Sequence, residues 1–242
     1  MSREDSIQLL CGEAETQWAE IEREYDAAML GKTIPENLKV RIKNLFENLR
    51  SILDYLAHDI ADRYCGGGSD RLYFPLLDTR PEYEAFMERC YRGLRAARPD
   101  LWDYLESIQP YPGSRWRWLR DFNQINNENK HDDFHPQVAK GIPMMGVKDP
   151  NGATVITMPV ATARASAFSN NSIQYVDEHG QKKLVPFTIN HDGSASGAGI
   201  TTTQWTGFFC RFAERDVSVM ALLERAKEQI GRNIPREIRQ HL

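Results

Sequence analysis

Apolar residues recur with helical spacing over the first quarter of the chain. The first stripe consists of Ile7, Cys11, Ala14, Trp18, Ile21, Tyr25 and Ala28. The second stripe consists of Leu38, Ile42, Leu45, Leu49, Ile52 and Leu56. Alternating steps of four and three place each set on one face of an amphipathic helix. The pattern therefore predicts two long helices, which a short connection would join as an antiparallel hairpin.

Glycine and proline mark where these helices begin and end. Gly31 follows the first helix, Pro35 lies near the first turn of the second, and the glycines at 66–68 follow its end. Pro99 and the Pro-Tyr-Pro-Gly sequence at 110–113 divide the next part of the chain. Three shorter helices are predicted there, at about 81–97, 99–108 and 114–131.

From about residue 136 the pattern changes to short stretches typical of β-strands. Five strands are predicted, at 142–148, 154–158, 172–176, 183–189 and 200–209. The turn sequences DPNG, DEHG and NHDG follow three of these strands, starting at Asp149, Asp177 and Asn190. Their close spacing favours an antiparallel meander. A final helix is expected from about 216 to 231, followed by a short tail.

These elements predict an α+β fold. An antiparallel helical bundle is expected over residues 1–135, and a small antiparallel sheet of about five strands with a closing C-terminal helix over 136–242. The apolar face of such a sheet needs a cover. We therefore expect the two parts to pack as one compact unit.

The composition indicates a soluble protein. The 242 residues carry a formal charge of −4, so any surface that attracts nucleic acid must be local. No apolar run is long enough for a membrane span, and the first residues are acidic where a signal peptide would be basic. The four cysteines are far apart, which argues against a disulfide framework or structural zinc. We expect a cytoplasmic location, no membrane partner and no cofactor.

The stretch NNENKHDDFH, at 126–135, carries the densest polar chemistry of the chain. At about 100° of rotation per helical residue, Asn126 and Asn129 fall on or beside the apolar face of their helix. Because buried amides are normally hydrogen-bonded, these two are expected to fix a neighbouring helix. Asn127, Lys130 and His131 fall on the opposite face.

The second face has the residue types of acid–base catalysis. Lys130 supplies a cation, and His131 and His135 supply imidazoles that titrate near neutral pH. Asn127 could orient a reacting group. The alternative is a polar helix end, since helix C-termini favour Lys and His. A metal site formed with Asp132 is a further alternative, although no strong metal-binding motif is present and no metal is predicted.

Arginine is concentrated between residues 89 and 120, a stretch that contains seven arginines and only three acidic residues. Arg115, Arg117 and Arg120 alternate with Trp116 and Trp118. Guanidinium groups beside aromatic rings suit single-stranded nucleic acid, through phosphate contacts and base stacking. Trp118 also lies on the apolar stripe of its helix, where a core position is the simpler interpretation.

A third polar set lies on the second long helix. Arg50, Asp54 and His58 are four residues apart, away from the main apolar stripe. They could line a groove or a dimer interface. The alternative is a solvated helix face stabilised by pairing between residues i and i+4.

Four short motifs give the chain a resemblance to a known family. They are NLRSILDYLAHDIA at 48–61, YFPLL at 73–77, SIQPY at 107–111 and NQINNENKH at 123–131. In this order they resemble uncharacterised bacterial proteins related to the HEPN helical superfamily, over about residues 35–135. The resemblance implies a helical bundle that forms homodimers. It also implies metal-independent RNA cleavage by an Arg-x4–6-His motif, in toxin or phage-defence systems.

The chain departs from that motif. Arg50 and His58 are one position too far apart, and Lys130 stands where the spacing to His135 requires arginine. Lysine keeps the charge but lacks the planar fork that binds phosphate through two hydrogen bonds. Two hypotheses follow. In the first, a dimeric HEPN-like protein binds RNA and acts as a ribonuclease through Lys130, His131 and His135. In the second, the chain is a non-catalytic interaction or sensor module whose polar cluster is structural.

Overall fold

The computed structural model of the chain describes residues 2–31, 33–66, 72–131, 137–165, 171–177, 179–190, 194–212 and 217–242. The chain forms two compact units. The helical unit consists of Met1–Val138 and Cys210–Leu242, and the β unit consists of Ala139–Phe209.

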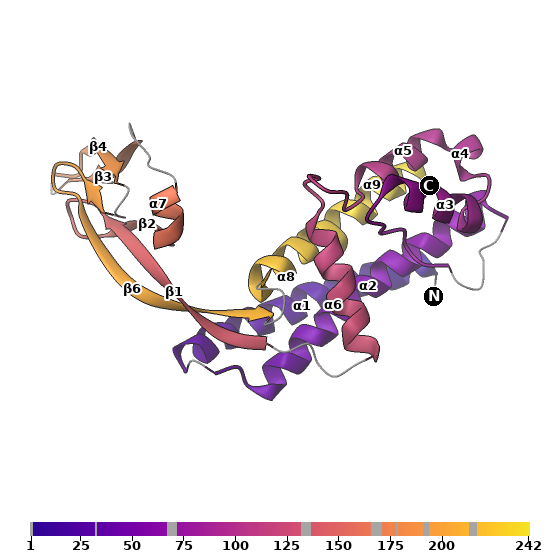
Figure 1. Cartoon of the computed structure of the whole chain (residues 1–242), viewed down its shortest axis with the longest axis horizontal. Helices are drawn as coiled ribbons and strands as arrows, with labels where there is room; N and C mark the ends of the chain where they lie inside the picture. Colours follow the sequence, from indigo (N-terminus) through magenta and orange to yellow (C-terminus); the bar gives the residue numbers. More distant parts are fainter. Residues whose placement is uncertain are drawn as a thin grey trace. The chain divides into compact units, whose positions relative to one another are not determined.

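The two predicted long helices are present as α1 (Arg3–Leu30) and α2 (Glu36–Tyr64). They pack side by side over their length (Figure 1). In α1 the buried side chains include Ile7, Ala14 and Ile21, which belong to the predicted stripe. The helical spacing of the sequence therefore identifies the packed face correctly.

The next helices are shorter than the sequence indicates. The predicted helix at 81–97 is divided into α3 (Arg80–Cys90) and α4 (Leu94–Ala97). Gly93 lies between them with φ of +88°, a backbone conformation that ends a right-handed helix and that glycine adopts without steric cost. They are followed by α5 (Pro99–Ser107) and α6 (Trp118–His131), close to the predicted positions.

The C-terminal helices belong to the helical unit. The chain continues from α8 (Val219–Glu228) through one π-helical segment, η1 (Gln229–Asn233), into α9 (Ile234–His241). These elements pack on α1 and α2, as Figure 1 shows, rather than closing the sheet as expected. The expected tail is helical, because its apolar residues fall on one face. That face consists of the fully buried Ile230, Ile234 and Ile238.

The strands form two antiparallel sheets rather than one sheet of about five strands. The first has the order β2-β1-β6-β7, and the second has the order β3-β4-β5. The prediction of a single sheet is wrong because the sequence does not specify that β1 lies beside β6. The bounds are β1 Gln137–Lys148, β2 Thr154–Pro159, β3 Asn171–Val176, β4 Lys182–Ile189, β5 Ala195–Ser196, β6 Thr201–Phe212 and β7 Val217–Ser218.

Two of the predicted turns are confirmed in the β unit. At Asp149 and Asp177 the aspartate side chain accepts hydrogen bonds from backbone N–H groups of its own turn, each 2.9 Å long. Gly152 and Gly180 complete these turns with positive φ, as DPNG and DEHG require. The unit also contains a short helix, α7 (Val160–Ala165), and has its own apolar core. That core includes Met145, Val147, Ile173, Phe187 and Ile189.

Candidate functional site

The segment between α5 and α6 forms a tight turn that projects aromatic and cationic side chains. Gly113 takes a φ of +80° at its start. The Trp116 N–H then donates a 3.0 Å hydrogen bond to the Ser114 hydroxyl, and the Arg117 N–H donates a 3.1 Å bond to the Ser114 carbonyl. These local bonds lead into α6 and leave Arg115 exposed to solvent.

A pocket of about 240 Å³ lies beside this turn in the helical unit. Residues from two distant parts of the chain line it. The first part supplies the turn and the start of α6, and the second supplies α8 and η1. The lining residues are Arg115, Trp116, Trp118, Arg225 and Gln229. We call this the arginine–tryptophan pocket.

Each guanidinium of the pocket lies over an indole ring. The Arg115 Cζ is 5.3 Å from the Trp116 ring centroid, and the Arg225 Cζ is 5.8 Å from that of Trp118. The two indole rings are 6.3 Å apart between centroids and are inclined by 37°. At such distances the negative face of an indole attracts a cation without neutralising its charge. The pocket therefore combines two positive charges with two large aromatic surfaces.

The arginines that line the pocket differ from the neighbouring arginines in their ion pairing. Within the described part of the chain, neither Arg115 nor Arg225 forms an ion pair, and no carboxylate is among the lining residues of the pocket. Arg117 and Arg120, which the sequence also assigned to nucleic-acid binding, lie 3.5 and 3.1 Å from carboxylate oxygens of Asp78. Their charge is partly neutralised. Of the three predicted arginines, the structure brings only Arg115 to the pocket.

Trp118 gives the pocket a rigid wall. Its side chain is buried, as its place on the apolar stripe predicts, and it contacts Phe122 edge to face with centroids 6.4 Å apart. Phe122 stacks on Phe46 of α2 at 5.4 Å, and Phe212 contacts Phe46 edge to face at 5.9 Å. Trp116 is only half-buried and keeps accessible ring surface. One indole is therefore fixed by the core, and the other is available to a ligand.

Sequence reasoning missed Arg225 and Gln229. Both lie on helices that the sequence places far from the tryptophans, and nothing in the local pattern of α8 distinguishes Arg225 from other exposed cations. Only the packing of α8 against α6 brings these residues to the pocket. The tryptophan–arginine alternation was the one signal that pointed to this part of the molecule.

Three of the predicted catalytic residues, Asn127, Lys130 and His131, belong to the C-terminal part of α6. Asn127 is exposed and Asn126 is fully buried, so the two faces expected from helical rotation are confirmed at these positions. Lys130 and His131 belong to the last turn of α6, but the described structure does not include their side chains. His135 lies outside the described residues. The acid–base proposal therefore rests on the sequence.

Asn126 differs from the expectation in one respect. Its side chain has no exposed surface, yet neither its amide nitrogen nor its amide oxygen has a hydrogen-bond partner among the described residues. The sequence predicted a bond to a neighbouring helix. A buried amide without partners destabilises the fold by about 1–3 kcal/mol.

Arg50 and Asp54 form a buried link inside the helical unit. The Arg50 Nη2 lies 3.2 Å from Asp54 Oδ1, and the Arg50 Nη1 donates a 2.9 Å bond to Asn123 Oδ1 of α6. The Phe74 N–H donates to Asp54 Oδ1 at 3.4 Å. The expected pairing of Arg50 with Asp54 is present. Arg50 is only 6% exposed, however, and its guanidinium is directed at α6 and not at solvent. This geometry is that of a structural tie, and His58, which is half-buried, is not part of it.

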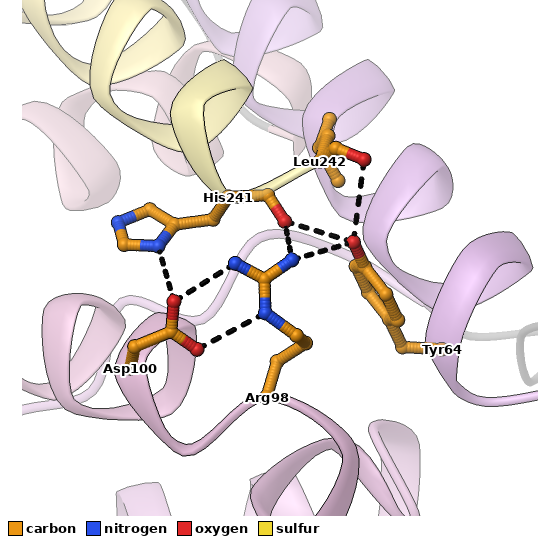
Figure 2. Close-up of polar contacts among 5 residues, drawn as sticks. All are labelled: Tyr64, Arg98, Asp100, His241 and Leu242. Carbon is orange, nitrogen blue, oxygen red and sulfur yellow. Dashed lines mark hydrogen bonds and ion pairs between the residues drawn. The ribbon is translucent and has the colours of Figure 1, made fainter.

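A second polar cluster, which the sequence did not indicate, joins α2, α5 and α9 (Figure 2). Arg98 binds Asp100 through Nε and Nη2 at 3.1 and 2.8 Å, and its Nη1 donates to Tyr64 Oη and to the His241 carbonyl. The Tyr64 hydroxyl donates to the His241 carbonyl at 2.8 Å, and His241 Nδ1 lies 2.8 Å from Asp100 Oδ2.

This cluster holds the end of α9 in place. Hydrogen bonds from Arg98, which has the larger effect, and from His241 hold the pKa of Asp100 well below its usual value. Arg63 adds a 2.8 Å hydrogen bond to the main-chain oxygen of Leu242. In Figure 2 the polar groups are directed at one another rather than at a cavity. We therefore assign the cluster to structure and not to catalysis.

The described residues contain no group of three or more His, Cys, Asp or Glu side chains that could hold a metal ion. Within the same ranges no helix is both long and apolar enough to cross a membrane. No match to this chain was found among protein-family models, curated proteins or solved structures. Function must therefore be inferred from the geometry of the molecule.

Proposed function

We propose that the helical unit binds single-stranded RNA at the arginine–tryptophan pocket. One observation carries the proposal: two guanidinium groups and two indole rings line one pocket without a carboxylate among its lining residues. A base would stack on the half-buried Trp116, and Arg115 and Arg225 would bind the adjoining phosphate.

The chemistry of a nucleotide matches each part of this pocket. Every base has a π-face, and stacking on an aromatic side chain contributes about 1–3 kcal/mol per base. Guanidinium groups bind phosphate through paired N–H donors at fixed angles. Those of Arg115 and Arg225 lie over rings, so a phosphate would not have to displace a carboxylate. The resemblance to HEPN proteins favours RNA over DNA as the strand.

Cleavage would occur away from the pocket. Trp118 and His131 are the first and last residues of α6, so their backbones are about 20 Å apart at 1.5 Å per residue. Lys130 and His131, in the last turn of this helix, would therefore act on a different nucleotide from the one held at the tryptophans. A strand long enough to follow α6 would be needed, and the pocket would act as its anchor.

Fluorescence anisotropy with a labelled RNA of twelve nucleotides tests the binding proposal. At low salt, near 50 mM, phosphate contacts are strong and binding should be measurable. Trp116→Ala should weaken it by about 5- to 150-fold, the equivalent of 1–3 kcal/mol of stacking. Trp18→Ala is the control, because Trp18 also lies under a cation but does not line the pocket. An absence of binding at this salt concentration, or equal effects of the two substitutions, would exclude the proposal.

A second candidate function is supported by an exposed apolar pair in the β unit. Leu184 of β4 is 68% exposed and Val176 of β3 is 51% exposed. In the antiparallel register Leu184 is opposite Gln174 and Val176 is opposite Lys182, so the two apolar residues are diagonal neighbours on one face. This face could bind a second copy of the chain, as the homodimer hypothesis requires.

Sedimentation velocity tests whether this face forms a dimer. Leu184→Glu should abolish a dimer that uses the face, and it should leave the affinity of a monomer for RNA unchanged. Leu30→Glu, at an exposed apolar position of α1 outside this face, is the control for the added charge. A dimer that survives Leu184→Glu, or a wild-type protein that is a monomer at all concentrations, would exclude this role for the β unit.

A further inference from the structure

A second cationic pocket lies between α1 and the C-terminal helices of the helical unit. Its volume is about 360 Å³. Two residues come from α1, and the others come from η1 and α9. The lining residues are Gln8, Cys11, Gly231, Arg232, Pro235, Arg236 and Arg239. We call this the triple-arginine pocket.

Local structure gathers the three arginines on one surface. Arg232, Arg236 and Arg239 are spaced by four and three residues, which places them within about 60° on one face of a helix. The first of them, Arg232, belongs to the π-helical turn η1, and such turns are frequent at functional sites. The turn packs against α2, since a Cβ built on Gly231 would lie at an ordinary contact distance, 3.6 Å, from a methyl carbon of Leu49.

The positive charge of this pocket is least neutralised at Arg232. Among the described residues, Arg232 has no ion-pair partner. Arg236 is 3.2 Å from Glu237, and Arg239 is 3.9 Å from Glu4 of α1, a distance at the limit of an ion pair. These pairs are exposed to solvent and are therefore weak. An incoming phosphate would compete with them at little cost.

The two pockets are neighbours along the same helical stretch. Gln229 of η1 lines the arginine–tryptophan pocket, and Gly231 and Arg232 of η1 line the triple-arginine pocket. From Arg225 to Arg239 the helix axis rises about 21 Å at 1.5 Å per residue. Exposed arginines lie along this stretch at 225, 232, 236 and 239, with the exposed Glu228 between the first two.

We propose that the triple-arginine pocket is a second phosphate-binding site for the RNA strand whose base occupies the arginine–tryptophan pocket. This inference rests on the proposed function and adds the length of the bound strand and its path along η1 and α9. A short RNA fills the first pocket only. A longer strand continues to Arg232 and Arg239, with Gln8 available as a hydrogen-bond donor to the backbone.

Salt dependence measures the number of phosphates that the protein binds. For a single strand, the slope of log K against log salt changes by about 0.7 for each phosphate contact. The double variant Arg232→Gln/Arg239→Gln should therefore lower the slope for a twelve-nucleotide RNA by about 1.4. It should leave the affinity for a dinucleotide unchanged. The matched control is Arg89→Gln/Arg92→Gln, which removes two exposed arginines at the end of α3 and just after it, neither of which lines the pocket.

Cys11 provides an independent readout without mutation. Cys11 lines the triple-arginine pocket and is half-buried, and burial raises the pKa of its thiol. Cys65 is also half-buried with a thiol pKa raised by burial, but it does not line this pocket. The twelve-nucleotide RNA should slow alkylation of Cys11 by N-ethylmaleimide several-fold, as followed by mass spectrometry. It should not change the rate at Cys65.

The outcomes separate the two proposals. If the protein binds no RNA, both are overturned. If Trp116→Ala weakens binding, but the double arginine variant keeps the wild-type salt slope and RNA does not protect Cys11, only the second phosphate site is overturned. A reduced slope together with protection of Cys11 supports it.

Discussion

Arg225 of α8 lies over the indole ring of Trp118 of α6, with its Cζ 5.8 Å from the ring centroid. The ring is buried in the helical core, so it holds the arginine at the mouth of the pocket. A guanidinium held by a ring rather than by a carboxylate keeps its charge for a ligand. This relationship makes the pocket a better candidate for anion binding than the arginine-rich sequence around it.

Arg225→Ala is expected to weaken RNA binding and to lower its salt slope by about 0.7, the loss of one phosphate contact. Lys227→Ala is the matched control. Lys227 is on the same helix and lies 5.7 Å from the Trp18 ring centroid, but it is paired with Glu15 at 2.8 Å. Anisotropy titrations at several salt concentrations measure both slopes. Equal changes in the two variants would mean that binding depends on net charge and not on the pocket.

Arg50→Ala should reduce the free energy of unfolding by about 3 kcal/mol, because it removes a buried cation and leaves Asp54 and Asn123 without their shared partner. Urea unfolding measures the change. Lys43→Ala is the control, since Lys43 forms an i to i+4 pair with Glu47 on the surface of the same helix. That substitution should cost less than about 1 kcal/mol. If Arg50→Ala leaves stability unchanged but abolishes RNA binding, the groove role considered from the sequence would be correct.

Asp100→Asn is expected to destabilise the protein in a pH-dependent manner. The pKa of Asp100 is lowered in the folded state by Arg98 and His241. A carboxyl whose pKa is lowered by folding stabilises the protein at pH values above its pKa in the unfolded chain, which is about 3.9. This stabilisation is lost as the pH falls from there through the lower pKa of the folded state. The wild type should therefore exceed the variant in melting temperature at pH 5–7, and the difference should shrink below about pH 4. A difference that stays constant down to pH 2 would contradict this assignment.

Asn126→Leu should raise the free energy of unfolding by about 1–3 kcal/mol. The substitution replaces a buried amide that lacks partners among the described residues with an apolar side chain of similar size. Asn127→Leu is the control, because its side chain is exposed and the change should be near zero. Chemical denaturation of both variants provides the measurement. A loss of stability in Asn126→Leu, accompanied by weaker RNA binding, would show that the amide has a functional partner.

Local sequence patterns were sufficient for most helices and turns. The apolar stripe of α1 placed Ile7, Ala14 and Ile21 in the core, and all three are buried. DPNG and DEHG gave turns whose first aspartate caps the backbone. These features depend on residues within one or two turns of each other, so the sequence contains the information directly. The α+β class followed from the same patterns.

The path of the C-terminal segment was not predictable in this way. Phe212 is fully buried against Phe46 of α2, although the strand that carries it was assigned to the sheet half. The amphipathic pattern of α8 and α9 indicated that each helix has an apolar face. It could not indicate which surface covers that face, because a helical stripe packs equally well on a sheet or on other helices.

The sequence by itself determined most of the helices, two of the hairpin turns, the cationic and aromatic character of residues 115–118, and the separation of Asn126 from Asn127 on α6. Tertiary structure decided which of those groups meet. It paired Arg117 and Arg120 with Asp78, brought Arg225 to Trp118, and fixed His241 on Asp100. The physical reason is that charge neutralisation and desolvation depend on contacts between distant segments, and hydrophobic periodicity records only that a face is buried.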